Sequence, residues 1–405
     1  MRRTRRTRFA MTEPLLSRAT APVQVKGWCP GAVRPMAAND GLVVRIRPPG
    51  GRLTAAQAQG VAALAQRFAH PLLELTNRAN LQLRGVNPAQ HGQLVEALRA
   101  LELVDGDAAT ESRRNVQVQP FWAGDDVTSH LAQHLSAHLG AHAIALPAKF
   151  GFAVDTGPVP CLREAYADVR LERHADGVLV YADGAHRGVV VPPNEAPERA
   201  LALAHWFVRA GGAPLGRGRM HALLGTCPLP AEWGQTPVAA HPGCVPGPGP
   251  HAAGQVVALA FGLVQATTLA RLGALGALRL TPWRSLLVEG ASGLTSSAEL
   301  ITDPLDARLR VSACTGAPGC GQAHGATRGL ASDLAQWVAP ASVLHVSGCA
   351  KGCAHPRPAA TVVVTPQGFD FVRRGLAASP PDISGLDRPA LDQLLQHEFG
   401  HAPQL

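Results

Sequence analysis

Four cysteines in the C-terminal quarter of the chain have the residue type and spacing of a metal-cluster site. They form two pairs, Cys314-x(5)-Cys320 and Cys349-x(3)-Cys353, with a longer stretch between the pairs. A [4Fe–4S] cluster is held by four thiolates, which two short loops can present from different directions. The residues between the cysteines are mostly small, so the backbone can approach a cluster and donate hydrogen bonds to its sulfides. The spacing therefore predicts an iron–sulfur cluster.

Zinc is the main alternative ligand for these thiols. Structural zinc sites usually show two C-x(2–4)-C pairs, and the longer spacer between Cys314 and Cys320 departs from that pattern. Plain packing cysteines are a third interpretation, but these would not be expected to gather in two glycine-rich loops. The remaining cysteines show no pair spacing and are predicted to pack as small apolar residues: Cys29, Cys161, Cys227 and Cys244.

Composition argues against two classes of partner. The net charge is +8, but five arginines fall within the first ten residues, so the body carries only about +3 and no nucleic-acid partner is expected. The apolar stretch from Val256 to Leu280 is interrupted by polar residues and predicts a buried helix, not a membrane span. With no span and no export signal, we expect a cytoplasmic protein whose cysteines are reduced thiols or metal ligands.

The residues before the cysteines predict a repeated scaffold. The first copy begins with a strand over 42–47, a turn at 48–51 and a helix that Thr54 caps and that ends near Ala69. Strands follow at 72–75 and 81–85. This β-α-β-β order is half of a ferredoxin-like sandwich.

A second copy is expected after a Pro/Gly-rich connector, His241 to Pro250, and begins with a helix from about Gly254 to Leu272. The segment Leu280–Gly290 then matches Leu75–Gly85: both begin with Leu-Thr, share a central Leu and close on Gly. The match favours an internal duplication over chance similarity.

Each copy is followed by an α/β pattern. Strands are predicted over Asn115–Val118 and Leu309–Ser312, and each leads through a helix to a second apolar strand, Ala143–Leu146 or Val343–Val346. We therefore expect an α+β fold with two pseudo-equivalent halves, each a ferredoxin-like half unit followed by an α/β unit. The predicted segments are a disordered basic tail (1–21), the first half unit (22–90), the first α/β unit (91–240), the second half unit (241–305) and the second α/β unit with the cysteines (306–405).

The duplicated scaffold and the cysteine arms together resemble the sulfite/nitrite reductase superfamily. Cys314-Thr-Gly-Ala-Pro-Gly-Cys320 and Ser347-Gly-Cys349-Ala-Lys-Gly-Cys353 match its two cluster arms. Leu75–Gln82 matches its first-half segment with an active-site arginine, here Arg78. The resemblance covers the chain from about Lys26 and implies the pseudo-twofold fold and the [4Fe–4S] cluster.

Within the superfamily the chain looks most like the precorrin-3B synthase family, on its compact length and on the segments Gly27–Gly31 and Leu146–Phe152. That resemblance implies an oxygen-dependent hydroxylation of precorrin-3A with closure of a lactone, in aerobic cobalamin biosynthesis. It also implies a mononuclear non-haem iron, dioxygen and an external electron donor. The sequence singles out no catalytic residue, no ligands for that iron and no oligomeric state.

The implied substrate is a tetrapyrrole with many carboxylates, which arginine binds through its planar fork. The family match points to five cavity residues on or beside predicted strands: Arg45, Arg47, Arg78, Arg114 and Lys149. The alternative for each is an exposed charge at a strand end. Arg284 occupies the matching segment of the second half and is a further candidate for the same cavity.

Histidines at every fourth position predict one stripe of a helix: His130, His134, His138 and His142. The adjacent stripe of Leu131, Leu135 and Leu139 is the expected core face, which favours solvated histidines over iron ligands. Three other histidines lie nearer the cluster loops in sequence and are alternative neighbours of the iron: His324, His345 and His355.

The main alternative function is a sirohaem-dependent sulfite or nitrite reductase. Such enzymes place two lysines near the anion in a Lys-Phe-Lys arrangement, but here Lys149-Phe150 is followed by Gly151, so one cation is missing. A non-catalytic cluster carrier is a third possibility, for which a duplicated scaffold of 405 residues is larger than required.

Overall fold

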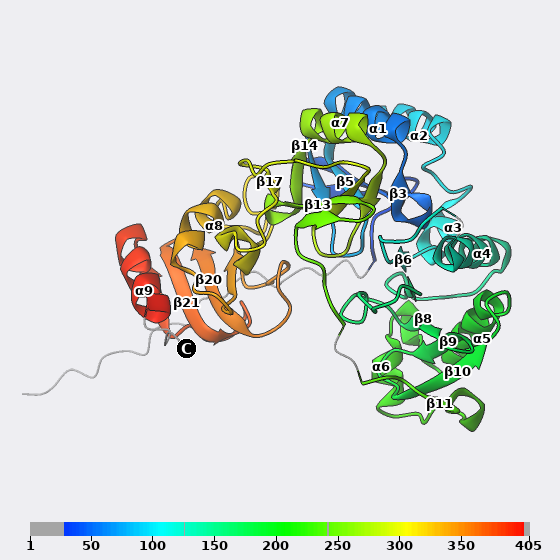
Figure 1. The fold of residues 1–405 in the computed structure, drawn as a ribbon. Coiled ribbons are helices and arrows are strands. Elements are labelled where there is room, and N and C mark those ends of the chain that lie inside the picture. Colours follow the sequence, from blue (N-terminus) through cyan, green and yellow to red (C-terminus); the bar gives the residue numbers. More distant parts are fainter. Residues whose placement is uncertain (1–27, 125, 241–242, 401–405) are drawn as a thin grey trace, which may run out of the picture.

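The computed structural model describes residues 28–124, 126–240 and 243–400, and the predicted basic tail lies outside them. The strands of the described residues form four sheets. Figure 1 shows them in three bodies: both half units under α1 and α7, the first α/β unit around β8 to β11, and the C-terminal α/β unit around β20 and β21 on the opposite side. Among the described residues no helix is long and apolar enough to cross a lipid bilayer.

The first half unit folds as predicted. Its elements in chain order are β1 (Met36–Ala38), β2 (Gly41–Ile46), a 3-10 turn (Pro49–Gly51), β3 (Arg52–Leu53), α1 (Ala55–Phe68), β4 (Leu72–Leu75) and β5 (Leu81–Val86). Thr54 caps α1: its hydroxyl accepts a hydrogen bond from the Gln57 N–H, and the Gln57 side chain accepts one from the Thr54 N–H. The helices α2 (His91–Ala100) and α3 (Ala108–Arg113) lead to the first α/β unit.

The second half unit repeats this order, which corrects one prediction. Its elements are β12 (Gly249–His251), β13 (Gly254–Leu259), β14 (Leu263–Gln265), α7 (Ala266–Leu275), β15 (Leu278–Leu280), β16 (Ser285–Glu289) and β17 (Leu300–Ile301). The predictions of a helix from Gly254 and of a buried helix over 256–280 are wrong for residues 254–259, which form the strand β13. This strand is buried along nearly its whole length, so its apolar run does not distinguish strand from helix. Phe261 and Gly262, with φ of +54° and +77°, turn the chain before α7.

Two matching turns reveal the duplication in the backbone. In the segments that begin at Leu75 and Leu280, the threonine hydroxyl accepts a hydrogen bond from the N–H four residues further on. The residue before that donor is left-handed in both copies, Ala79 with φ +54° and Arg284 with φ +60°. The closing glycines, Gly85 and Gly290, have φ of +70° and +68°. The predicted internal duplication is therefore confirmed.

The half units share one hydrophobic core because each lends a strand to the other. β3 pairs antiparallel with β15, and β14 pairs antiparallel with β4. α1 and α7 lie side by side over the sheets (Figure 1). The core accordingly contains residues of both copies, such as Val44, Leu81, Val257 and Leu286. The two half units form a single folded body.

The α/β units also correspond to each other. The first contains β6 (Val116–Val118), α4 (Val127–Ala141), β7 (Phe152–Asp155), β8 (Val169–His174), β9 (Gly177–Ala182), β10 (Arg187–Val191), α5 (Ala196–Arg209), α6 (Met220–Leu224) and β11 (Thr236–Pro237). The second contains β18 (Val311–Ala313), α8 (Arg328–Leu334), β19 (Leu344–Ser347), β20 (Ala359–Thr365), β21 (Gly368–Gly375), β22 (Ile383–Leu386) and α9 (Arg388–Gly400). In each, three parallel strands are followed by antiparallel ones.

One strand of the first α/β unit was wrongly predicted. Ala143–Leu146 is a loop, and the parallel partner of β6 is β7, which begins at Phe152. Ile144 is buried while its neighbours Ala143 and Ala145 are exposed, and Pro147 ends the run, so the apolar composition there reflects one packing residue. The core stripe of α4 is confirmed, because its three leucines are buried whereas three of the four histidines are exposed: His130, His134 and His142.

Candidate functional site

The four predicted cluster cysteines lie in two loops at the same edge of one sheet. Cys314 directly follows β18, and Cys349 and Cys353 follow β19. Because β18 and β19 pair in parallel, their carboxyl ends meet at this edge. Burial raises the pKa values of the Cys349 and Cys353 thiols, and both are raised further by the neighbouring thiols, which include Cys320. The structure thus brings the two cysteine pairs together.

The backbone of these loops donates hydrogen bonds to the thiols. The Gly348 N–H donates to Cys314 Sγ at 3.2 Å. At Cys349, the backbone N–H of Lys351 partly offsets the effect of burial on the thiol pKa. Small residues permit this geometry: Gly352 has φ +63°, and a Cβ on Gly348 would lie 2.7 Å from that of Ala323. Such N–H donors stabilise thiolates and cluster sulfides.

Arg328, the first residue of α8, provides a test of whether the site fits a cluster. Its guanidinium is buried, and Nε and Nη2 have no hydrogen-bond acceptor among the described residues, although Nη2 lies 3.4 Å from Glu74 Oε1 as an ion pair. The preceding Thr327 donates its hydroxyl to the carbonyl of Cys314 at 2.7 Å, which places Arg328 beside the first cysteine arm. An anionic cluster would supply the missing acceptors. The donor set therefore fits a [4Fe–4S] cluster.

A mononuclear iron does not find a matching ligand set. Within residues 28–124, 126–240 and 243–400, no group of three or more His, Cys, Asp or Glu side chains lies close enough to hold one metal ion. Non-haem iron commonly uses two histidines and a carboxylate, whereas a four-iron cluster spaces its thiolates more widely than a single ion does. We therefore assign no chemistry to the mononuclear iron that the resemblance implies.

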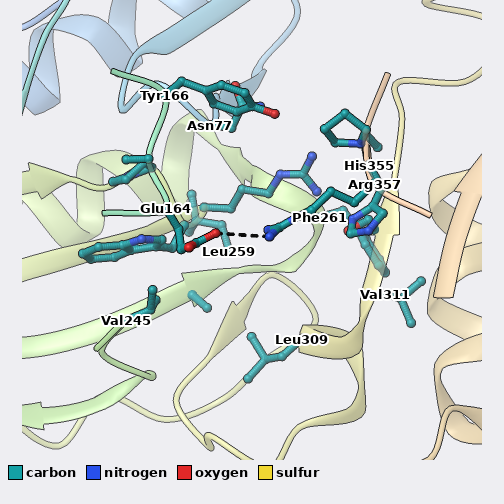
Figure 2. Close-up of a pocket in the computed structure, with 18 of the residues that line it drawn as sticks. Asn77, Glu164, Tyr166, Val245, Leu259, Phe261, Leu309, Val311, His355 and Arg357 are labelled. Atoms are coloured by element: carbon teal, nitrogen blue, oxygen red, sulfur yellow. Dashed lines mark hydrogen bonds and ion pairs between the residues drawn. The ribbon is translucent and has the colours of Figure 1, made fainter. Parts of the chain in front are cut away.

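A cleft of about 1210 Å³ lies beside the cysteine loops. It is larger than most small-molecule pockets, which measure roughly 300–1,000 Å³. Figure 2 shows residues of all three bodies in its lining: Glu164 and Tyr166 from the first α/β unit, Asn77, Leu259 and Phe261 from the two half units, and His355 and Arg357 from the loop after the second cysteine pair. The volume and the meeting of three bodies suit a macrocyclic ligand.

Arg284 lines this cleft, and its guanidinium makes no hydrogen bond or ion pair with any described residue. Arg308, which also lines the cleft, differs because its guanidinium pairs with Asp306 at 2.6 Å. Burial lowers the pKa of Arg284, and the charges of Glu74, Cys314 and Tyr166 oppose that shift. The guanidinium thus lies between the cysteine loops and the cleft. Arg284 therefore lines a cleft, but the five residues with which it was expected to share a cavity do not line that cleft.

An ion pair spans the cleft. Arg357 Nη1 lies 3.2 Å from Glu164 Oε2, and Figure 2 shows the two side chains reaching toward each other from opposite walls. Both are largely exposed. An exposed pair of this kind contributes little stability, about 0–1 kcal/mol, so a ligand carboxylate can replace Glu164 at Arg357 at small cost.

The five arginine and lysine residues predicted from sequence lie outside the lining of this cleft. Two are already used within the chain. Arg114 makes a bidentate ion pair with Asp105, at 2.7 and 2.9 Å. Arg47 donates to the carbonyls of Glu111 and Pro30, and burial lowers its pKa to about 10.

The other three differ in their surroundings. The Arg78 guanidinium lies 5.4 Å from the centre of the Tyr166 ring, and burial lowers its pKa. Arg45 donates to Gln82 Oε1 at 2.9 Å and its Nε has no partner among the described residues. Lys149 is exposed. Of the five, Arg78 is the one that contacts a residue of the cleft.

All three candidate histidines lie near the cysteine loops, His324 through its N–H, which donates to the Gly348 carbonyl at 2.8 Å. His345 is fully buried on β19, neither ring nitrogen has a partner among the described residues, and its ring centre lies 5.9 Å from that of His355. Burial lowers the pKa of His345 to about 4, and the charges of His355 and Arg284 add to this. His355 lines the cleft, whereas His324 is exposed.

Sequence reasoning missed Glu164, Tyr166, Arg357 and Arg328. The first three lie in loops without a motif, and only folding brings them together. Arg328 had a usable signal, because a cation at the start of a helix opposes the helix dipole and calls for a nearby anion.

Comparison with known proteins agrees with this architecture. Residues 34–101 match the family model described as Nitrite/Sulfite reductase ferredoxin-like half domain. A curated protein of Sinorhizobium sp, named precorrin-3B synthase, is 30% identical over 400 residues, covering 88% of this chain and 84% of that protein. The solved structure of the Mycobacterium tuberculosis NirA protein matches with a TM-score of 0.58 at 17% identity, over 90% of this chain and 82% of that one. At that identity the structural likeness shows the fold.

Proposed function

Because the chain belongs to the precorrin-3B synthase family of the sulfite/nitrite reductase superfamily, we propose that it converts precorrin-3A to precorrin-3B in aerobic cobalamin biosynthesis. In this reaction one atom of dioxygen enters the product as a hydroxyl, and a ring-A acetate closes a lactone. The other oxygen atom leaves as water, with two electrons from an external donor and two protons. The observation that carries the proposal is the large cleft beside the cysteine loops, with Arg284 between them and no acceptor for its guanidinium among the described residues.

The chain's own residues bind and orient the substrate. Arg284 binds one carboxylate, because its half-buried guanidinium lines the cleft and has no internal acceptor among the described residues. Arg357 binds a second once Glu164 is displaced. The Tyr166 ring, backed by Arg78, packs against the macrocycle. Arg45, Arg47, Arg114 and Lys149 stay predictions from sequence, as do the segment boundaries 22–90, 91–240, 241–305 and 306–405.

Cys314, Cys320, Cys349 and Cys353 would hold the [4Fe–4S] cluster, which supplies single-electron transfer when bound. The loop N–H groups and Arg328 surround it with donors. No further redox step is assigned to residues of the chain.

The alternative, a sirohaem-dependent sulfite or nitrite reductase, has the size of the cleft and the fold of the superfamily in its favour. Gly151 counts against it. A Cβ at this position would lie 3.3 Å from the carbonyl oxygens of both Asn115 and Tyr166, so the second lysine of a Lys-Phe-Lys arrangement requires the backbone to move.

Turnover under isotope-labelled dioxygen tests the proposal. Purified protein with normal iron and sulfide content, precorrin-3A and an electron donor should give a product that carries one labelled oxygen. The Arg284→Ala variant with the same cluster content should bind the substrate less tightly. An unlabelled product, intense sirohaem bands in the visible spectrum and reduction of sulfite would together overturn the proposal in favour of the alternative.

A further inference from the structure

The first cysteine arm, residues 314–320, is held by the first half unit, which is distant in sequence. Arg84, on β5, donates from Nη2 to the carbonyl oxygen of Gly319, the residue before Cys320. The same guanidinium donates from Nε and Nη2 to the two carboxylate oxygens of Asp40, at 3.0 Å each. The Arg84 and Asp40 side chains are only 14% and 11% exposed. Asp40 therefore holds the Arg84 guanidinium in the orientation from which it donates to the Gly319 carbonyl.

A glycine just after the arm allows a close approach to the turn between β1 and β2. At Gly319 a Cβ would be in ordinary contact with Asp40 Oδ2 and Arg84 Nη2, at 3.4 and 3.6 Å, so those two contacts do not require a glycine there. A Cβ on Gly321, just after Cys320, would meet the Asn39 side chain at 2.0 Å. The turn between β1 and β2, residues 39–40, thus packs directly against this arm.

A second contact ties the same region to the same sheet. Arg328, which follows the arm, pairs with Glu74 of β4 at 3.4 Å. The Glu74 carboxylate is itself oriented by Gln82 of β5, whose Nε2 donates to Oε2 at 3.1 Å. Both contacts come from strands of the first half unit, although all four cysteines belong to the second α/β unit.

We propose that Arg84 is a positioning residue for the iron–sulfur site: held by Asp40, it fixes the Gly319 carbonyl and so the placement of Cys320 relative to Cys314. An arm of small residues bends easily, so it needs an external anchor to present two thiolates at a fixed separation. A charge-assisted hydrogen bond from a guanidinium to a carbonyl is such an anchor. The inference rests on the cluster assignment of the proposed function but not on the reaction.

Cluster retention in matched variants tests the proposal. Arg84→Gln removes the anchor, and Arg84→Lys retains the charge without the fork. The control is Arg114→Gln, because Arg114 also binds one aspartate in bidentate fashion and one carbonyl oxygen, that of Arg47, with side chains 11% and 14% exposed. Each protein is reconstituted anaerobically, and iron, sulfide, the electron paramagnetic resonance spectrum and the rate of iron loss to a chelator are measured.

The Arg84→Gln protein should lose its cluster about tenfold faster than the wild type, the Lys variant should lie between them, and Arg114→Gln should match the wild type. Urea midpoints of the two Gln variants should be similar, which separates positioning from general stability. Where Arg84→Gln does not fold, Asp40→Asn, which loosens Arg84, should show the same direction with a smaller change.

Wild-type retention in Arg84→Gln, or an equal loss in Arg114→Gln, would overturn the proposal, as would a wild-type protein that binds no cluster. A wild type that holds its cluster but does not convert precorrin-3A would defeat the proposed function and leave the role of Arg84 standing.

Discussion

The two α/β units present corresponding strand ends but use them differently. In the second unit the loops after β18 and β19 carry Cys314, Cys349 and Cys353, and Ser347 at the end of β19 donates its hydroxyl to the Cys349 carbonyl at 2.7 Å. In the first unit, Asp155 ends the corresponding strand β7, and its carboxylate accepts the N–H groups of Cys161 and of the next residue, at 2.8 and 2.7 Å. One copy stabilises its loop with a buried carboxylate, and the other places in its loops the cysteines that we propose as cluster ligands.

The difference shows how a duplicated scaffold can acquire a site in one copy. Strand pairing is the same in both units apart from the added edge strand β11 of the first, so the chemistry depends on loop residues at the carboxyl ends of the strands. Cys161 in the first unit is not suited to bind a metal as a thiolate, because burial and the neighbouring Asp155 carboxylate raise the pKa of its thiol far above the usual range. Its thiol therefore stays protonated.

Serine substitutions of the cysteines give the strongest test of this difference between the two α/β units. Cys→Ser at Cys314, Cys320, Cys349 or Cys353 should each abolish most bound iron and bleach the broad visible absorption, because an alcohol does not replace a thiolate ligand. Cys161→Ser in the corresponding loop should retain both. Iron and sulfide analysis with visible spectroscopy is the measurement. A full cluster in any one of the first four variants would remove that cysteine from the ligand set.

The two matching turns offer the next comparison, Arg78 in the first half against Arg284 in the second. Arg284→Ala should weaken precorrin-3A binding about tenfold to hundredfold, since one charge-assisted contact is worth about 1.5–3 kcal/mol. Arg284→Lys should restore part of the affinity. Arg78→Ala should have a smaller effect, because Arg78 does not line the cleft and contacts the Tyr166 ring that does.

Binding titrations on variants with normal iron and sulfide would decide this point. A larger effect at Arg78 than at Arg284 would mean that the substrate carboxylates lie on the first-half side of Tyr166. An exposed arginine on α2, Arg99, gives a suitable control, since within the described part of the chain its guanidinium pairs only with Glu96 on the same helix.

What could be predicted from sequence depended on how local the signal is. The first half unit followed from a strand pattern, a turn and the Thr54 cap, all readable within a few residues. β13 did not, because a strand buried along its length has the composition of a buried helix. Applying the predicted duplication would have found it: Gly41-x-Val43-Val44 and Gly254-x-Val256-Val257 open equivalent strands.

The candidate site also combines a feature that is local in sequence with one that is not. The cysteine spacing is local, so all four residues could be chosen before the fold was known. The cleft is assembled from three bodies, and no spacing links Glu164 with Arg357. Internal partners are also not visible in the sequence: Arg114 has the sequence context of a cavity arginine, and the structure adds that its guanidinium binds Asp105.

Two equivalent glycines allow the half units to be compared through smaller changes in folding free energy. Gly85 and Gly290 are both left-handed, so an alanine at either costs about 1–2 kcal/mol of folding free energy. At Gly290 the new Cβ meets open space, whereas at Gly85 it would lie 2.4 Å from the His70 ring. Gly85→Ala should therefore destabilise more.

Urea unfolding of the two variants would measure the difference. In a His70→Ala background the two alanine variants should become nearly equal, because the ring that distinguishes them is gone. An equal loss in the original background would mean that the exposed His70 side chain moves aside freely.

The smallest expected effect is a pH dependence confined to the second α/β unit. His345 on β19 is fully buried, and burial lowers its pKa to about 4, while Ala153 occupies the corresponding position on β7. Below pH 6.5 the unfolded chain binds a proton at this histidine that the folded chain does not, so stability is retained above pH 6.5 and is lost as pH falls toward 4. The slope approaches about 1.4 kcal/mol per pH unit.

His345→Gln has no titrating group, so its unfolding free energy should change less between pH 7 and pH 5 than that of the wild type, by about 1–2 kcal/mol. Urea midpoints at the two pH values, on proteins matched in cluster content, would show it. Ala153→Gln is the control for placing a polar side chain on the equivalent strand, and it should leave the wild-type pH dependence intact. Identical pH dependence in wild type and His345→Gln would mean that the buried imidazole finds a partner that lets it protonate in the folded state.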